Sequence, residues 1–245
     1  MSTALSASRY QVLPGPEGLL PPSASAMGVT LPQDGEGLVE GVLVSEAETL
    51  KALAKNLLTR RNPTLFPGPL VVWGWNHHTQ EKASVVLEIA AEIPGVKIIP
   101  MPDYRPIYPK IDPEAVINPC HPNLTIWHNK IEACIFVGVH CHFANVTLKM
   151  VRAGTNCYTI ALCAEAGHED AMASLPQCGI EKLRRVVDAL RQAKKDGVTP
   201  WALTEAGKKE LAAEREQRKK QREAIIAAAP QFAHELVAGL DENEE

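Results

Sequence analysis

The sequence predicts an α/β fold: an open, doubly wound parallel sheet, with an extended N-terminal arm and a C-terminal helical appendage. Two observations support this prediction. Short, nearly continuous apolar runs alternate with amphipathic helical patterns over roughly residues 62–196, and such runs are typical of parallel strands that are buried on both faces. The flanking segments differ in composition. We therefore divide the chain into a Pro/Gly-rich arm (1–44), an α/β domain (45–196) and a charged helix with an acidic tail (197–245).

The composition excludes several classes of protein. The chain has 245 residues, of which 45% are hydrophobic and 22% charged, so it can form a core and is not wholly disordered. A net charge of −4 at pH 7 argues against nucleic-acid binding. Its apolar runs are far shorter than the ~20 residues of a membrane helix, and its first residues lack the pattern of a secretory signal. We expect a cytoplasmic protein that binds neither nucleic acid nor membranes.

The arm is rich in Pro, Gly and Ser and has no apolar periodicity over residues 1–40. Because proline fixes φ and lacks an N–H donor, we expect no regular element there. The arm does carry apolar side chains, namely Leu13, Leu19, Leu20 and Leu31. These leucines favour an arm that wraps a partner. Deleting residues 1–40 is then expected to weaken assembly and to leave the core folded.

The elements of the α/β domain follow from periodicity. A helix is predicted over 45–61, because Ser45 and Glu48 have the spacing of a capping box. Further helices are predicted over 79–92, over 179–194 and across Phe143 to Met150, where apolar residues recur at helical spacing. Strands are predicted at 70–73, 96–100, 134–138 and 157–162.

Two segments suggest partner contacts. The crossover from 100 to 131 is rich in proline and carries Tyr104, Tyr108 and Trp127, and such long segments in compact domains are usually functional or interface-forming. Residues 204–226 are predicted to form one long, highly charged helix. This helix is either solvated and stabilised by i,i+4 ion pairs or docked on a partner subunit. The acidic tail, 241–245, is expected to be disordered.

Polar residues with metal-binding or acid–base potential follow three of the predicted strands. In open parallel sheets, ligands bind beyond the carboxyl ends of the strands. The candidate crevice there comprises His77, His78, His140, Cys141, His142, Cys163 and His168. Such side chains suit zinc or a similar cation, and imidazoles can also bind an anion. Their spacing matches no known metal signature, so a metal, an organic ligand or partner residue, and structural histidines all stay open. We assign no metal ligand.

Known catalytic and cofactor motifs are absent. The six cysteines contain no C-x-x-C pair, which argues against a disulfide framework or a four-cysteine iron–sulfur motif. Cys134 and Cys157 are expected to be small core residues and free thiols. The chain has no G-x-G-x-x-G, P-loop or G-x-S-x-G motif. A Cys141 nucleophile beside His140 or His142 is conceivable, but adjacent residues rarely supply nucleophile and base together. We assign no catalytic residue.

One segment is familiar. Residues 135–148, IFVGVHCHFANVTL, resemble the family that groups CO dehydrogenase β and acetyl-CoA synthase ε subunits, in which a strand ends in Gly-Val and a helix begins through Ala-Asn. Residues 67–74, PGPLVVWG, resemble that family's opening strand, and the resemblance covers roughly 62–195. It implies a fold similar to the central domain of thiamine-diphosphate enzymes, usually without the cofactor.

The sequence departs from the archaeal ε pattern in its His-Cys-His, its long crossover and its extended termini. Together with residues 66–69, 101–106 and 161–165, these features are more similar to the ε-type accessory subunit of five-subunit 2-oxoacid:ferredoxin oxidoreductases (pyruvate or 2-oxoglutarate synthases) of the reductive citric acid cycle. This resemblance implies a non-catalytic subunit in a hetero-oligomer that fixes carbon. Thiamine diphosphate, iron–sulfur clusters and coenzyme A would be held by partner subunits. Ferredoxin would interact with these subunits and only indirectly with this chain.

Two other functions stay open. One is an ε-type subunit of a CO dehydrogenase/acetyl-CoA synthase complex, whose partner would be a nickel–iron–sulfur subunit. The other is an independent enzyme that uses a metal or a small molecule.

Overall fold

The computed structural model describes residues 31–72, 76–101 and 121–241, with side chains through residue 227. The chain forms two compact units, residues 1–201 and 202–245. The predictions for residues 1–30, for most of the proline-rich crossover and for the end of the acidic tail lie outside the described residues.

The first unit is built around a seven-stranded sheet with the order β2-β1-β7-β6-β5-β3-β4. Neighbouring strands from β7 to β4 run parallel, whereas β1 and β2 pair antiparallel at one edge. The strands are β1 (Glu36–Val39), β2 (Val42–Ser45), β3 (Thr64–Pro67), β4 (Lys97–Ile98), β5 (Ala133–Val137), β6 (Tyr158–Leu162) and β7 (Ala173–Leu175). The predicted α/β class with a mainly parallel sheet is therefore confirmed.

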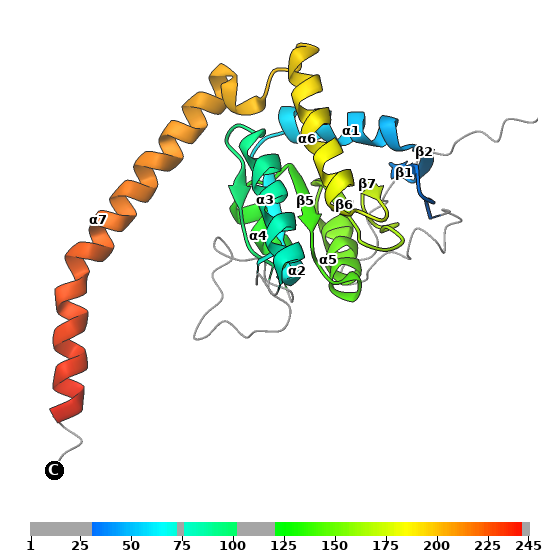
Figure 1. Ribbon diagram of the computed structural model, residues 1–245. Helices are drawn as coiled ribbons and strands as arrows, with labels where there is room; N and C mark the ends of the chain where they lie inside the picture. The colour runs from blue at the N-terminus through cyan, green and yellow to red at the C-terminus, as the bar shows by residue number, and fades with distance from the viewer. Residues whose placement is uncertain (1–30, 73–75, 102–120, 242–245) are drawn as a thin grey trace, which may run out of the picture. The chain divides into compact units, whose positions relative to one another are not determined.

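Helices cover both faces of this sheet (Figure 1). One face packs against α1 (Glu46–Thr59), α3 (His77–Ala91) and α6 (Ile180–Lys195). The other packs against α4 (Pro122–His128) and α5 (Cys141–Gly154). Because successive strand residues point to opposite faces, Ile135 joins the first core and Phe136 the second. This arrangement confirms the doubly wound prediction.

The prediction of a strand at 70–73 is wrong. Residues 70–72 lie in the short helix α2 (Pro69–Val72), and the opening strand is β3, six residues earlier. A short apolar run does not by itself distinguish a strand from a buried helical turn. Here Pro69 decides the outcome, because its fixed φ favours the first position of a helix.

The prediction of no regular element over 1–40 is also wrong for its last residues. β1 and β2 form a hairpin whose two turn residues, Glu40 and Gly41, have φ of 52° and 78°, the geometry of a type I′ turn. Leu38, in β1, is fully buried. The buried Lys182 of α6 reaches this edge, with its Nζ 3.0 Å from Asp34 and 3.4 Å from Glu46.

The point at which the strand order reverses lies between β3 and β5, where ligands bind in many such sheets. Here α2 fills it. The Leu70 N–H donates to the Gly138 carbonyl at 3.0 Å, and the Gly68 N–H to Val137 at 2.8 Å. Gly138 has φ +68°, and a Cβ at this position would lie 2.3 Å from Cγ2 of Val71. The chain therefore occupies the switch point of its own sheet.

The second unit consists mainly of α7 (Glu205–Asp241). The Thr204 hydroxyl accepts a hydrogen bond from the Gly207 N–H, and Lys208 pairs with Glu205 three residues earlier. The predicted charged helix is present and extends fifteen residues beyond the expected end at 226. Across the described part of the chain, no helix combines the length and the apolar character that crossing a membrane requires.

Candidate functional site

Two thiols and an imidazole meet at the carboxyl ends of β5 and β6. Cys141 is the first residue of α5, Cys163 directly follows β6, and His168 lies in the loop after it. One ligand atom from each lies within 4.8 Å of the others. The two Sγ atoms are 3.6 Å apart, and both cysteines are free thiols. We call these three residues the thiol–imidazole cluster.

One contact holds the backbone of His168 and another holds its ring. The residue is 3% exposed, and its backbone N–H donates to Oγ of Ser174 in β7 at 2.8 Å. Its Nδ1 lies 2.6 Å from Oδ1 of Asn145, on α5. Because an amide carbonyl oxygen accepts hydrogen bonds, Nδ1 carries the proton. In the neutral form of this ring the lone pair is on Nε2, whereas a hydrogen bond from the ring to the Cys163 thiolate uses the form with a proton on both nitrogens.

Cys163 is the more acidic of the two thiols. Burial raises the pKa of Cys163, but its hydrogen bonds with His168 and with the backbone amides of Glu165 and Gly167 lower it to about 6. Of these, the Glu165 N–H lies 3.3 Å from the sulfur. Burial and the neighbouring Cys163 raise the pKa of Cys141 to about 11. Cys163 therefore forms a thiolate more readily than Cys141 does.

One face of α5 holds the loop in place. Cys141, Asn145 and Arg152 are spaced four and seven residues apart, so they share a face of the helix. They contact Cys163, His168 and Asp170 in the same order along the loop. The last contact is an ion pair of 2.8 Å whose side chains are 2% and 3% exposed. This face of α5 therefore positions both the thiol and the imidazole of the loop.

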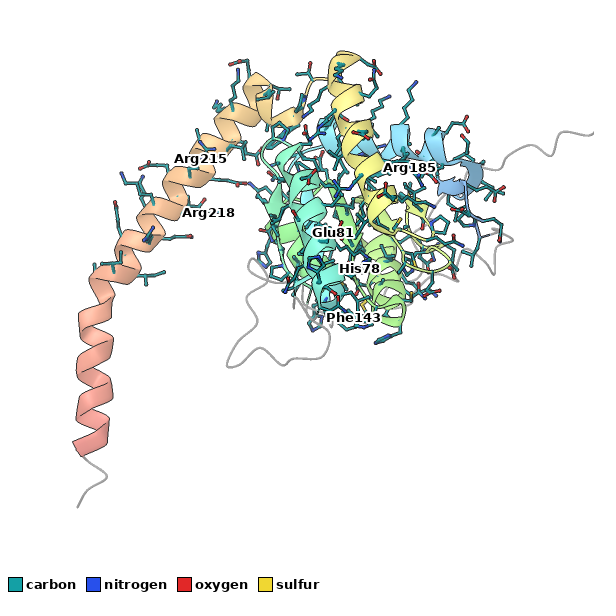
Figure 2. All side chains as sticks on the ribbon, viewed as in Figure 1. His78, Glu81, Phe143, Arg185, Arg215 and Arg218 are labelled. Carbon is teal, nitrogen blue, oxygen red and sulfur yellow. The ribbon has the colours of Figure 1, made fainter. Side chains whose placement is uncertain are left out.

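Three of the seven sequence-predicted crevice residues form the cluster. We expected His77 and His78 in a loop after a strand, and this prediction is wrong. Both lie in the exposed first turn of α3, because Asn76 caps that helix and its side chain accepts a hydrogen bond from the Thr79 N–H at 2.9 Å. Figure 2 labels His78 on α3 and Phe143 on α5. The ring centroids of His140 and His142 are 6.0 Å apart, but neither residue belongs to the thiol–imidazole cluster.

The residues that support the cluster are not among those predicted from the sequence. Asn145 and Ser174 position His168, and the buried pair of Arg152 and Asp170 anchors its loop. The spacing of Asn145 from Cys141 is a signal of a shared helix face. That His168 is the residue contacted by Asn145, however, depends on how the loop after β6 folds over α5.

The other described cysteines differ from the cluster. Cys134 and Cys157 are buried in the core with their Sγ atoms 3.6 Å apart, as predicted for small core residues. Burial raises the pKa of Cys134 well above its ordinary value. Cys178 is buried, and its thiol donates to the Leu175 carbonyl at 3.3 Å. Cys120 lies outside the described residues.

The opposite end of the sheet carries a groove of about 1090 Å³. Basic side chains line it, among them Arg60, Arg61 and Lys130. Arg60 lies over the ring of Tyr158, with its Cζ 4.9 Å from the ring centroid. Burial raises the pKa of Tyr158 to about 12. No residue of the predicted crevice lies in this groove.

The fold and the cluster define a doubly wound α/β protein with a thiol–imidazole cluster at the carboxyl edge of its sheet. Residues 27–196 match the model of the family described as CO dehydrogenase beta subunit/acetyl-CoA synthase epsilon subunit. The chain belongs to this family, which confirms the resemblance seen in the sequence. No curated protein sequence matches the chain.

Proposed function

We propose that this chain is an accessory, ε-type subunit of a 2-oxoacid:ferredoxin oxidoreductase, such as a pyruvate or 2-oxoglutarate synthase. The family membership carries this proposal, because the family groups subunits of larger redox assemblies. The motifs at residues 66–69, 101–106 and 161–165, and the long crossover, favour the 2-oxoacid enzymes within it. The chain would act in the cytoplasm, in carbon fixation by the reductive citric acid cycle.

The occupied switch point supports a role without a cofactor at that position. In dinucleotide- and flavin-binding sheets, the backbone amides at this point face the ligand. In this chain the amides of Gly68 and Leu70 donate to β5 and to Gly138, and the side chain of Val71 packs against Gly138. This packing supports the proposal that thiamine diphosphate, iron–sulfur clusters and coenzyme A are held by the partner subunits and that this chain has a stabilising or tuning role.

Exposed apolar side chains support contact with partners. Trp127 on α4 is 57% exposed and Leu87 on α3 is 62% exposed. Tryptophan is enriched at protein interfaces, where its large ring is buried on assembly. Both side chains lie in the α/β unit, so this unit as well as the termini would contribute to assembly.

Native affinity purification tests the proposal. The full tagged chain is purified from cells that produce it, and the co-purifying proteins are identified by mass spectrometry. We expect thiamine-dependent and ferredoxin-like chains, and a tag on a thiamine-dependent chain should in turn recover this protein. Recovery of a nickel–iron–sulfur subunit would instead establish the CO dehydrogenase/acetyl-CoA synthase role, and a chain recovered alone would reject both.

The structure also changes how the N-terminal arm must be tested. Deleting residues 1–40 would remove β1, with its buried Leu38, and the contact between Asp34 and Lys182. We therefore expect such a deletion to destabilise the core as well as to remove the arm. A deletion of residues 1–30 preserves all of these contacts, so a loss of assembly in that variant would report on the arm itself.

A further inference from the structure

We propose that Cys141, Cys163 and His168 form a binding site for a zinc-like divalent transition-metal ion, in which the protein supplies three ligands and the fourth position is open. Neither the family nor the function proposed above assigns such a site. The proposal also replaces our sequence-based choice to assign no metal ligand. It rests on the donor set, the spacing of the donor atoms and the support of the histidine.

The donor set matches zinc. Thiolate sulfur and imidazole nitrogen are the ligands that zinc prefers, and sites with three protein ligands leave a fourth position for water or another group. Two thiolates and one neutral imidazole carry two negative charges, which balance the charge of the divalent ion. Cys141 is the solvent-exposed member of the cluster, so we expect the open position to be reached from its side.

The spacing of the sulfurs also fits. A tetrahedral zinc ion with Zn–S bonds of about 2.3 Å separates its two sulfurs by about 3.8 Å. The Sγ atoms of Cys141 and Cys163 are 3.6 Å apart, whereas a disulfide needs about 2.0 Å. All three donor atoms lie within 4.8 Å of one another. Tetrahedral coordination would draw the three donor atoms closer together than this limit.

The surroundings of His168 are those of a zinc ligand. Metal-bound histidines commonly donate their second ring N–H to an oxygen, which fixes the tautomer and the orientation of the ring. The Nδ1–H of His168 donates to Oδ1 of Asn145 at 2.6 Å, so Nε2 is the nitrogen with a lone pair. The residue is 3% exposed, and Ser174 fixes its backbone. The ring is thus oriented before any metal binds.

The core pair, Cys134 and Cys157, provides a matched control within the same fold. Its two sulfurs are also 3.6 Å apart. Both residues are buried, however, and neither belongs to a described group of three possible metal ligands. If paired sulfurs alone were sufficient, this pair would bind the metal too. The cluster differs by its histidine and by its access to solvent.

Metal analysis of the full chain tests the site. The reduced protein is loaded with zinc, passed through a desalting column and analysed by inductively coupled plasma mass spectrometry. We expect about one zinc ion per chain, as for a single site. C163S and H168A should each bind at least tenfold more weakly in competition with a chromophoric chelator, and C157S should bind like the wild type. Circular dichroism shows which variants are folded.

Cobalt(II) gives a second readout. Bound at this site it should show thiolate-to-metal charge transfer in the near ultraviolet, and the band should weaken by at least half in C141S and C163S but be kept in C157S. A folded, reduced chain that binds neither zinc nor cobalt overturns the proposal, as does binding that persists in the triple variant C141S/C163S/H168A. A Cys141–Cys163 disulfide that forms in air, in a chain that binds no metal when reduced, would assign the cluster to thiol redox chemistry instead.

Discussion

Nδ1 of His168 lies 2.6 Å from Oδ1 of Asn145, so a residue in the loop after β6 is oriented by a residue in the first turns of α5. The same helix face carries Cys141 toward Cys163 and Arg152 toward Asp170. Three successive contacts therefore fix the loop to the helix.

The first prediction concerns Asn145. In N145A the His168 ring loses the acceptor that fixes its tautomer, so we expect metal affinity to fall by about 10–100-fold. N145D keeps an acceptor oxygen and should retain most of the affinity. Chelator competition measures both variants against the wild type. Equal affinities in N145A and the wild type would show that Asn145 does not support the ligand.

The second prediction concerns the buried ion pair. In D170N the buried guanidinium of Arg152 loses its ion-pair partner 2.8 Å away, so the free energy of unfolding should fall by about 3–5 kcal/mol. The double variant R152L/D170L removes both charges and should recover much of this loss. Urea denaturation measures the change. D188N, whose carboxylate is 75% exposed and 3.9 Å from Arg191, is the control and should unfold like the wild type. A wild-type midpoint for D170N would refute the role of the pair.

The third prediction concerns the closed switch point. Gly138 and Gly197 both have positive φ, but a Cβ at Gly138 meets Val71 at 2.3 Å, whereas nothing lies within 4 Å at Gly197. G197A should therefore cost about 1–2 kcal/mol of backbone strain. G138A should cost a further ~1–3 kcal/mol from overpacking, and V71A in that background should relieve part of it. Thermal denaturation compares the variants. Equal losses in G138A and G197A would mean that α2 does not pack tightly there.

The fourth prediction concerns pH. Glu92, at the end of α3, accepts hydrogen bonds from Lys194 and from Arg191, the latter at 2.7 Å, and these bonds lower the pKa of its carboxyl from 4.5. A carboxyl whose pKa is lower in the folded state stabilises the fold above its unfolded pKa. That contribution is lost as the pH falls through the folded value.

The E92Q variant should therefore melt below the wild type at neutral pH, and the two should converge at pH values below 4.5. E81Q, whose carboxylate is half exposed and 3.9 Å from Arg184, is the control for an exposed ion pair and should melt like the wild type at neutral pH. Scanning calorimetry across the acid range measures these differences. A difference between E92Q and the wild type that does not change with pH would contradict the assignment.

The α/β layers could be predicted from the sequence because the patterns were strong. The apolar runs of β5 and β6 and the periodic face of α6 gave those elements nearly their observed bounds. The first strand was misplaced because the run after Gly68 is apolar in either conformation, and Pro69 starts a helix there. β1, β2 and β7 were missed because they have only four, four and three residues, too few to show an alternating pattern.

The candidate site could be predicted in part. Placing Cys141, Cys163 and His168 near one another followed from the rule that loops meet at the carboxyl edge of a parallel sheet. That rule does not say which side chains point inward. His77 and His78 turn outward on α3, and Asn145 acquires its role through a contact between residues 23 positions apart in the chain.

Ferredoxin reduction by the assembled complex, measured with and without this chain, distinguishes an accessory subunit from one that holds a catalytic centre. If the chain is an accessory subunit, the complex lacking it keeps its thiamine diphosphate, its iron–sulfur clusters and its 2-oxoacid-dependent activity, and loses stability or rate. Adding the purified chain back should restore them. If the complex without this chain lacks one of these cofactors entirely and has no activity, the accessory role is wrong and the catalytic centre lies in this chain.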